Sequence, residues 1–543
     1  MTINTFTRNL RLLFILIVSV HFLCNAQVQD SLSDATLPKF DVPEFEITGK
    51  EIIALPSSSK PHALELNKFD VNKIELNFPS EQKNIFSKEL RTPNETLQLE
   101  NNYPLRALFH IGRFASPELD ISYGRAIAGL SYYSKGNFQS SNGFIKNADY
   151  KRGEFLFQLS TSNSSSETHQ GILFEAALKY NFHKYRFYGS HSPSLSRNIS
   201  SFEVSGRMNS PQNLAMFENI RFGWNSFSLH DTLNRGESRL NFVTSGQLQI
   251  GDIQIKNSIG FDYNVLESAA DPFIIFTKNL ATVHSNQISS INIGFAGYLF
   301  QHSNSVVQGL ISPQVEYDYF PESNWLMRIG FTPDVESNNL QHLQTINHYV
   351  STDSRIFQTN NYLNFFVSTN YNPISQLELK SEFRYKKSAL FPVFIDSLTT
   401  GVWKPEYAGK TTSVSLNVET EYLLNHAHTF FGKFIIQNVK NSLFSEQLPY
   451  IHPAEFSAGY TYKFSFPLST TIRYFYGLAQ TTQVSSSEKL SDIFLTDIHL
   501  QYYITSNFSA IASMNNIFDR KYYRWKNYRG ERFMFSLGII GQW

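Results

Sequence analysis

The sequence of 543 residues predicts an all-β fold: a transmembrane antiparallel up-and-down β-barrel of about 22 strands, with 16–20 as the alternative. Three observations lead to this prediction. The N-terminus has the pattern of a secretory signal, the residues from 105 onward alternate in one long segment after another, and the chain ends inside such a segment. An even number of strands is expected because both chain ends should lie on the periplasmic side.

Residues 1–26 are predicted to be a secretory signal peptide. Two arginines precede an apolar run from Leu12 to Leu23, which is too short to span a membrane as a helix. Small residues then offer a cleavage site between Ala26 and Gln27. A lipidated Cys24 is disfavoured because a small residue should precede it. Cleavage removes this only cysteine, so disulfides and thiolate metal ligands are excluded from the mature chain.

Residues 27–103 are predicted to be an extended periplasmic segment with little core of its own. Prolines recur along it, and its 8 basic and 13 acidic residues give a charge of 8 − 13 = −5. We expect this segment, inward-folded loops such as 338–360, or a partner to occlude the barrel lumen, and docking of a partner is the other role open to 27–103. Residues 104–543 are then the barrel.

Long strands with alternating faces follow one another from Leu105. The clearest lie at 253–264, 376–386, 413–424 and 456–466. They exceed the usual globular length of about 5–6 residues and suit a tilted membrane span of about 9–11. Tight turns are expected at 251–252, 321–324, 372–373, 425–428 and 467–468, and longer loops near 137–150, 338–360, 394–410, 442–452 and 483–491. Short periplasmic turns and long external loops are typical of outer-membrane barrels.

The polar faces of these strands carry many charges. The predicted lumen-facing residues are Glu378, Lys380, Glu382, Arg384, Lys386, Glu419, Glu421 and Lys463. Burying so many charges without water would cost several kcal/mol per ion unless each were well paired. A wide barrel holds water, which removes this penalty. Two interpretations stay open: the charges contact a substrate, or they only keep the wall polar and pair across strands.

The last residues alternate between apolar and mostly polar or small side chains and end on Trp543. The tail resembles the C-terminal signal that outer-membrane barrels present to the barrel-assembly machinery. Ser536, Gly538 and Trp543 fit that pattern, whereas Gly541 stands where a hydrophobic residue is expected.

The segment from Asn515 to Tyr523, Asn-Asn-Ile-Phe-Asp-Arg-Lys-Tyr-Tyr, resembles the Asn-Leu-Phe-Asp-x-x-Tyr motif of TonB-dependent receptors. Arg-Gly-Glu-Arg-Phe at 529–533 is similar to the start of their last strand. The matching residues are Asn516, Phe518, Asp519, Tyr523, Gly530, Arg532 and Phe533. Those receptors carry a folded plug before the barrel, which 27–103 is too short to provide. The resemblance therefore implies a plug-less, receptor-like barrel, and the Asn-, Phe- and Tyr-rich composition resembles Bacteroidota outer-membrane proteins.

Two functions are compatible with these patterns. The first is transport or ligand reception across the outer membrane. The second is a structural or docking subunit of a secretion or assembly complex, with a periplasmic or surface lipoprotein as partner. Expected contacts in both cases are outer-membrane lipids, including lipopolysaccharide, and the barrel-assembly machinery. The balance of 46 basic and 46 acidic residues argues against nucleic acid.

Enzymatic chemistry is not expected. The sequence has no nucleophile-elbow, zinc-protease, phosphate-loop, dinucleotide-binding or EF-hand motif, so we predict no cofactor and no metal. A Ser–His site on the barrel wall is the remaining enzymatic alternative. A soluble all-β protein is disfavoured by the signal peptide, the terminal Trp543 and the strand lengths.

Overall fold

The computed structural model describes residues 104–543, except 128, 162–172, 210–217, 252, 268–269, 304–305, 397–399, 408, 444–446 and 484–487. The predicted signal peptide and periplasmic segment, residues 1–103, lie outside the described residues.

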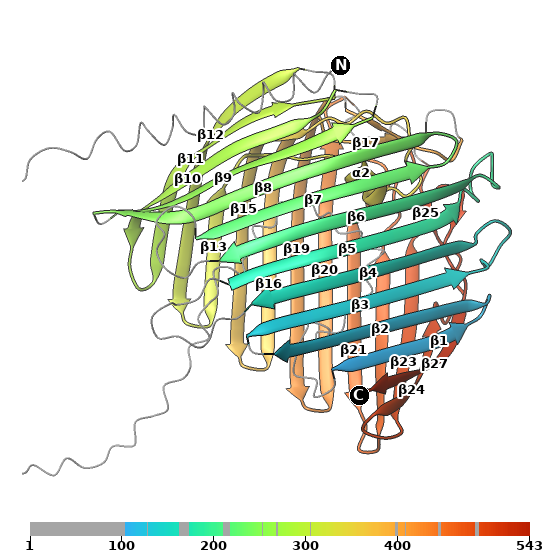
Figure 1. Ribbon diagram of the computed structural model, residues 1–543. Coiled ribbons are helices and arrows are strands. Elements are labelled where there is room, and N and C mark those ends of the chain that lie inside the picture. Colours follow the sequence, from blue (N-terminus) through green and yellow to red (C-terminus); the bar gives the residue numbers. More distant parts are fainter. Residues whose placement is uncertain are drawn as a thin grey trace, which may run out of the picture. The chain divides into compact units, whose positions relative to one another are not determined.

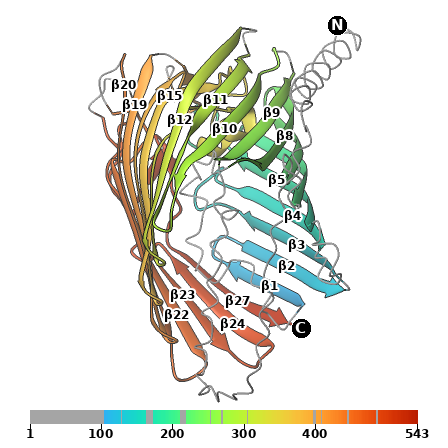
Figure 2. The same ribbon diagram turned by 90° about the vertical axis from the view of Figure 1, so that its left-hand side faces the viewer.

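The main sheet closes on itself as an antiparallel barrel. It contains 23 strands. Two of them, β13 (Trp325–Phe331) and β14 (Asp334–Glu336), pair with the same neighbour, β15 (Thr359–Ile374), so the wall has 23 − 1 = 22 strand positions. The last strand, β27 (Met534–Gln542), pairs with the first, β1 (Leu105–Gly112), which leaves no free edge. The predicted fold and strand number are confirmed, and Figures 1 and 2 show blue β1 beside red β27.

The other wall strands each pair with the next one along the chain (Figure 1). The first half of the wall continues with β2 (Ser116–Ile127), β3 (Leu130–Ser141), β4 (Tyr150–Thr161), β5 (Leu173–Arg186), β6 (Ser196–Asn209), β7 (Asn219–His230), β8 (Asn234–Ile250), β9 (Ile253–Leu266), β10 (Phe273–Ser285), β11 (Ser289–Gln301) and β12 (Val307–Glu322). The second half consists of β16 (Leu377–Ala389), β19 (Lys410–Asn425), β20 (His428–Asn441), β21 (Ala454–Lys463), β22 (Leu468–Gly477), β23 (Ile493–Tyr503) and β24 (Phe508–Asn515).

Three smaller elements lie in the connections between wall strands. Helix α2 (Leu340–Ile346) lies between β14 and β15. Strands β17 (Val393–Ile395) and β18 (Lys404–Glu406) pair with each other, as do β25 (Tyr523–Trp525) and β26 (Tyr528–Arg529). Among the described residues, no helix has the length and apolar character needed to cross a membrane.

Three of the four clearest predicted strands are confirmed as β9, β16 and β19. The fourth is confirmed as β21 except for 464–466, because β21 ends at Lys463. The predicted turn at 372–373 is wrong, because both residues lie within β15 and the chain turns at 375–376 instead. Pro373 has no N–H to donate, but it lies at an irregularity of the ladder between Tyr371 and Ile374, where no donor is needed. Pro321 is placed in the same way inside β12.

The connections differ in length between the two ends of the barrel. Short turns at 251–252, 286–288, 323–324, 375–376 and 426–427 lie at the end that also holds Leu105 and Trp543. The opposite end carries the long connections 337–358, 390–409, 442–453, 478–492 and 516–533. The predicted alternation is therefore present, although β4 to β5 and β6 to β7 are separated by longer stretches of sequence than the other strand pairs that join at the short-turn end.

One face of the wall strands is apolar and exposed. Ile311 of β12 is 82% exposed, and Phe295, Leu537 and Ile539 are also exposed. Directly paired residues share a face, and in β11 the residues that alternate with Phe295 include the buried Ala296 and Tyr298. An apolar exposed band around a closed barrel is the arrangement that contacts lipid.

Candidate functional site in the barrel mouth

Residues 337–358, here called the cross-segment, lie across the long-loop end of the barrel. On one side their backbone contacts β5 and β6, where the Tyr185 hydroxyl donates to the His348 carbonyl. On the other side the Trp403 amide donates to the Tyr349 carbonyl at 3.1 Å, and Trp403 belongs to the connection from β16 to β19. β14 and β15, which the cross-segment joins, occupy the thirteenth and fourteenth of the 22 strand positions, so the segment reaches wall strands that are seven or more positions away.

An aromatic core holds the cross-segment to the neighbouring connections. Tyr349 stacks on Tyr528 with ring centroids 3.5 Å apart, and Trp403 packs against Tyr528 at 5.8 Å. Trp525 and Tyr450 pack on Trp403 from the side, and Trp403 is 0% exposed. We call the cross-segment, which contains Tyr349, together with Trp403, Tyr450, Trp525 and Tyr528, the cap. Four connections distant in sequence thus share one core.

Two arginines of the inner wall hold backbone carbonyls of the cross-segment. Arg197 of β6 donates from Nη1 to the His348 carbonyl at 3.1 Å and to the Val350 carbonyl at 2.7 Å. Arg235 of β8 donates from Nη1 to the carbonyls of Thr352 and Ser354, each at 2.5 Å. The four carbonyls belong to alternate residues, so consecutive stretches of the same segment are attached to two wall strands.

Glu237 of β8 holds the other end of the cross-segment. Its carboxylate accepts from the Leu340 amide at 2.7 Å and from the Gln341 amide at 2.9 Å, the first two residues of α2. These amides have no partner inside the helix, and a carboxylate also suits the positive end of the helix dipole. Asn264 of β9 donates to the same carboxylate at 3.2 Å. We call Arg197, Arg235 and Glu237 the clasp.

Arg197 and Glu237 are buried charges with partners, and Arg235 is half-buried. Arg197 is 1% exposed and forms an ion pair with Asp231, which lies in the turn between β7 and β8. Burial opposes ionisation of Asp231, but the hydrogen bond and the charge of Arg197 outweigh it and hold its pKa below the ordinary value. Removing one partner from such a pair leaves an uncompensated buried charge, which is strongly destabilising.

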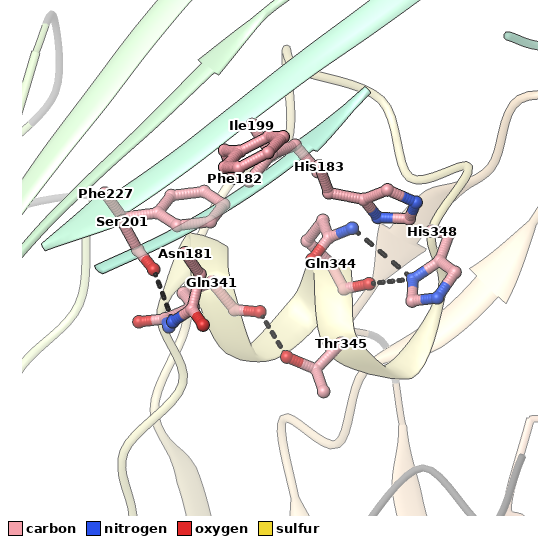
Figure 3. Close-up of a pocket in the computed structure, with 10 residues that line it drawn as sticks. All are labelled: Asn181, Phe182, His183, Ile199, Ser201, Phe227, Gln341, Gln344, Thr345 and His348. Atoms are coloured by element: carbon pink, nitrogen blue, oxygen red, sulfur yellow. Dashed lines mark hydrogen bonds between the residues drawn. The ribbon is translucent and has the colours of Figure 1, made fainter. Parts of the chain in front are cut away.

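A cavity of about 160 Å³ lies between α2 and the inner wall (Figure 3). Its lining contains amides, hydroxyls, two histidines and apolar side chains but no Asp, Glu, Lys or Arg: Asn181, Phe182, His183, Ile199, Ser201, Phe227, Gln341, Gln344, Thr345 and His348. The rings of His183 and His348 are 5.9 Å apart. In the described part of the chain, no three His, Cys, Asp or Glu side chains are grouped to hold a metal ion.

The predicted lumen charges of β16 and β19 lie together on one strand face. Register pairs Glu378 with Glu421 and Lys380 with Glu419, and directly paired residues share a face. Within the strands, Lys380 contacts Glu378 at 2.8 Å and Arg384 contacts Glu382 at 3.0 Å. The remaining contacts and positions are Glu419 to Lys433 at 2.6 Å, Lys386 to Glu336 at 3.6 Å, and Lys463 exposed at the end of β21. Pairing of charges within the wall favours the interpretation that they keep it polar, and a substrate role stays a prediction.

The receptor-like motif builds the connection between β24 and β27. Asn516, at a φ of 48°, donates to the carbonyls of Arg520 and Glu531 and accepts from the Arg520 amide. Asp519 pairs with Arg532 and accepts from the Phe533 amide at 2.9 Å. The remaining motif residues are Tyr523, which pairs with Arg529, Gly530, whose amide donates to Tyr522, and Phe518, which is 58% exposed. The motif therefore shapes a loop, which is a structural role.

The predicted assembly-signal residues lie in the strand that closes the barrel. Ser536 pairs with Gly112 and Gly538 with His110. Trp543 exchanges backbone hydrogen bonds with Leu105 at 2.8 and 2.9 Å. A side chain on Gly541 would start 2.3 Å from the outer edge of the exposed Trp543 ring.

The sequence did not single out the clasp. Arg235 and Glu237 lie in a stretch of alternating polar residues that looks like any other charged lumen face. Arg197 and Val350 are 153 residues apart in the sequence, so no local sequence pattern indicates their contact. The expected long loop at 338–360 was the one available signal, and the cross-segment occupies that position.

The fold and the cap define the class of the molecule: a closed 22-strand antiparallel barrel, all-β apart from one short helix in the described residues, whose mouth is crossed by its own chain. Neither a protein-family model nor a curated protein matches the sequence. Solved structures do match. The FrpB iron transporter from Neisseria meningitidis (F3-3 variant) has a TM-score of 0.61 at 11% identity, over 82% of each chain.

Two further structures are similar to the same extent. The copper transporter OprC has a TM-score of 0.61 at 11% identity, over 81% of this chain and 80% of its own. The siderophore receptor PiuA from Acinetobacter baumannii has a TM-score of 0.61 at 10% identity, over 81% of each chain. At such low identity the likeness shows a common fold. All three are transporters or receptors, which agrees with the receptor resemblance of the C-terminal motif.

Proposed function

We propose that this protein is an outer-membrane barrel that transports or receives an external ligand without a separate plug of the size that TonB-dependent receptors carry. The observation that carries the proposal is the wall itself, closed by β1 and β27, apolar and exposed on one face and charged on the other. Even 16–18 strands enclose an aqueous channel, so 22 strands enclose a wider one. The charged face then lines a wetted lumen.

The proposal has consequences for location and partners. The chain enters the outer membrane of a Gram-negative, Bacteroidota-like cell after cleavage near Ala26 and Gln27. Its apolar band contacts lipids including lipopolysaccharide, and the barrel-assembly machinery recognises Ser536, Gly538 and Trp543. The motif residues 516–533 act as structural elements of the wall, and no enzymatic step is assigned. The docking-subunit alternative depends on residues 27–103, which lie outside the described residues.

Fractionation and gel migration test the proposal together. The full-length protein, expressed in a Gram-negative host, should be recovered in the outer-membrane fraction. It should migrate faster on a detergent gel before boiling than after, because a folded barrel resists unfolding by the detergent. Recovery in the soluble periplasm, with no shift on boiling, would contradict an outer-membrane barrel.

A further inference from the structure

The cross-segment obstructs the mouth of the barrel. It reaches from β14 and β15 to β5, β6 and β8, and the core that it shares with other connections includes the fully buried Trp403 and Leu343. The connection is also much longer than is needed to join β14 to β15, since it runs from 337 to 358. A long loop that folds inward and buries its apolar residues restricts the opening that it crosses.

The attachment of this segment to the wall includes polar contacts as well as the apolar core that Leu343 shares with Phe227 and Leu229. Arg197 and Arg235 bind backbone carbonyls, and Glu237 binds backbone amides. When the segment moves away, water can form hydrogen bonds both with the wall side chains and with the backbone groups that they release. An apolar wall would hold the segment by packing alone and would leave its backbone groups without partners.

We propose that the cross-segment is a gate built into the barrel and that the clasp of Arg197, Arg235 and Glu237 holds it closed. This inference depends on the proposed membrane function and goes beyond it, because it assigns the occlusion of the lumen to 337–358 and to three named wall residues. The cavity beside α2 leaves part of the helix face toward β5–β7 without close packing.

Single-channel recording in planar bilayers tests the gate with the full-length protein. The test variant combines Arg235→Ala with Glu237→Gln, which removes hydrogen bonds at both ends of the cross-segment. The matched control is Glu419→Gln on β19. It removes a charge from the polar face of the wall at a residue that pairs with Lys433 and has no contact with the cross-segment among those described. We expect the double variant to show a several-fold higher mean conductance than the wild type, and the control to match the wild type.

A second variant keeps the test valid if the double variant fails to fold. Replacing 340–356 by a short Gly-Ser linker removes the gate while leaving the wall strands intact, and it should open the barrel to at least the same conductance. Heat-modifiable migration of every variant shows whether the barrel has formed. If the barrels form and both variants conduct like the wild type, the gate assignment is wrong.

Deletion of 27–103 separates the gate from the other candidate for occlusion. High conductance after this deletion alone, with the clasp variants still closed, would assign occlusion to the N-terminal segment and overturn the proposal. Failure of the wild type itself to insert would instead contradict the membrane function on which the proposal depends.

Discussion

Gly530 has no room for a side chain. A Cβ placed there would lie 2.0 Å from the ring of Tyr522, which is buried, and the Gly530 amide donates to the Tyr522 carbonyl at 2.8 Å. The glycine of the receptor-like motif is thus required because an aromatic ring from the same loop covers it. Resemblance to a family at this position reflects packing, and it carries no information about a ligand.

Gly530→Ala should destabilise the barrel, because Tyr522 or the loop backbone has to move. Overpacking of this kind costs about 1–3 kcal/mol. The temperature at which the fast-migrating form disappears on a gel should fall. Gly136→Ala serves as the control, because nothing lies within 4 Å of a Cβ at that position. Equal transitions for the two variants would show that the ring contact has no structural importance.

At the level of elements, the cap behaves as one packed unit made from four connections. Its core contains Trp403, Tyr349, Tyr450, Trp525 and Tyr528, which come from four different connections. Each connection alone would be a flexible polar loop. Together they bury large aromatic surfaces, which is the main source of stability for such a unit.

Trp403→Ala should loosen the cap without unfolding the wall. Removing a buried tryptophan costs about 3–5 kcal/mol. Protease added to intact cells should cut the long connections faster, while the barrel remains heat-modifiable. Trp325→Ala is the matched control, because Trp325 lies partly exposed at the short-turn end, away from the cap. A variant that is cut no faster than this control would contradict a shared aromatic core.

Acid should weaken the attachment of the cross-segment. Burial lowers the pKa of His348, and the nearby charges of Arg524 and Arg152 lower it further, although a hydrogen bond to the Gln344 carbonyl acts in the opposite direction. The attached state therefore disfavours the protonated ring. The detached state has the ordinary value of about 6.5, so the stability of attachment is complete above that pH and is lost progressively as the pH falls below it.

The measurement is the conductance of the full-length protein as a function of pH. We expect openings to become more frequent below about pH 6.5, and His348→Gln to reduce this dependence because glutamine does not titrate. The groups that face the ring are His183 and Tyr185 on the wall. An unchanged pH profile in His348→Gln would exclude this histidine as the source.

At the scale of the whole molecule, the sequence predicts the wall well and the cap poorly. Alternation along β16 and β19 follows directly from the pleat, since one face contacts lipid and the other is charged. The same logic fails at Pro373, where a ladder irregularity lets the strand continue past a proline. The number of strands and the closure of the barrel could be predicted because the wall strands repeat the same alternation of apolar and polar residues.

The gate could not be derived in this way. Arg197 and Glu237 have the same alternating context as the other inner charges, and only the folded chain brings them to 337–358. Long-range contacts of this kind depend on the three-dimensional course of a long connection, which local periodicity does not encode. The sequence therefore identifies 338–360 as one candidate for an inward-folded loop but does not identify its partners on the wall.

Single cysteines along one strand test the central claim, an outer-membrane barrel with a wetted lumen, most directly. The only natural cysteine, Cys24, lies in the predicted signal peptide, so the background should be low. In isolated outer membranes, a small water-soluble thiol reagent should label cysteines on one face and spare those on the other. The positions expected to react are Lys380, Glu382 and Arg384, and the protected positions are Leu379, Phe383 and Tyr385. Labelling with a period of two residues would support the barrel, whereas equal labelling at all six positions would contradict it.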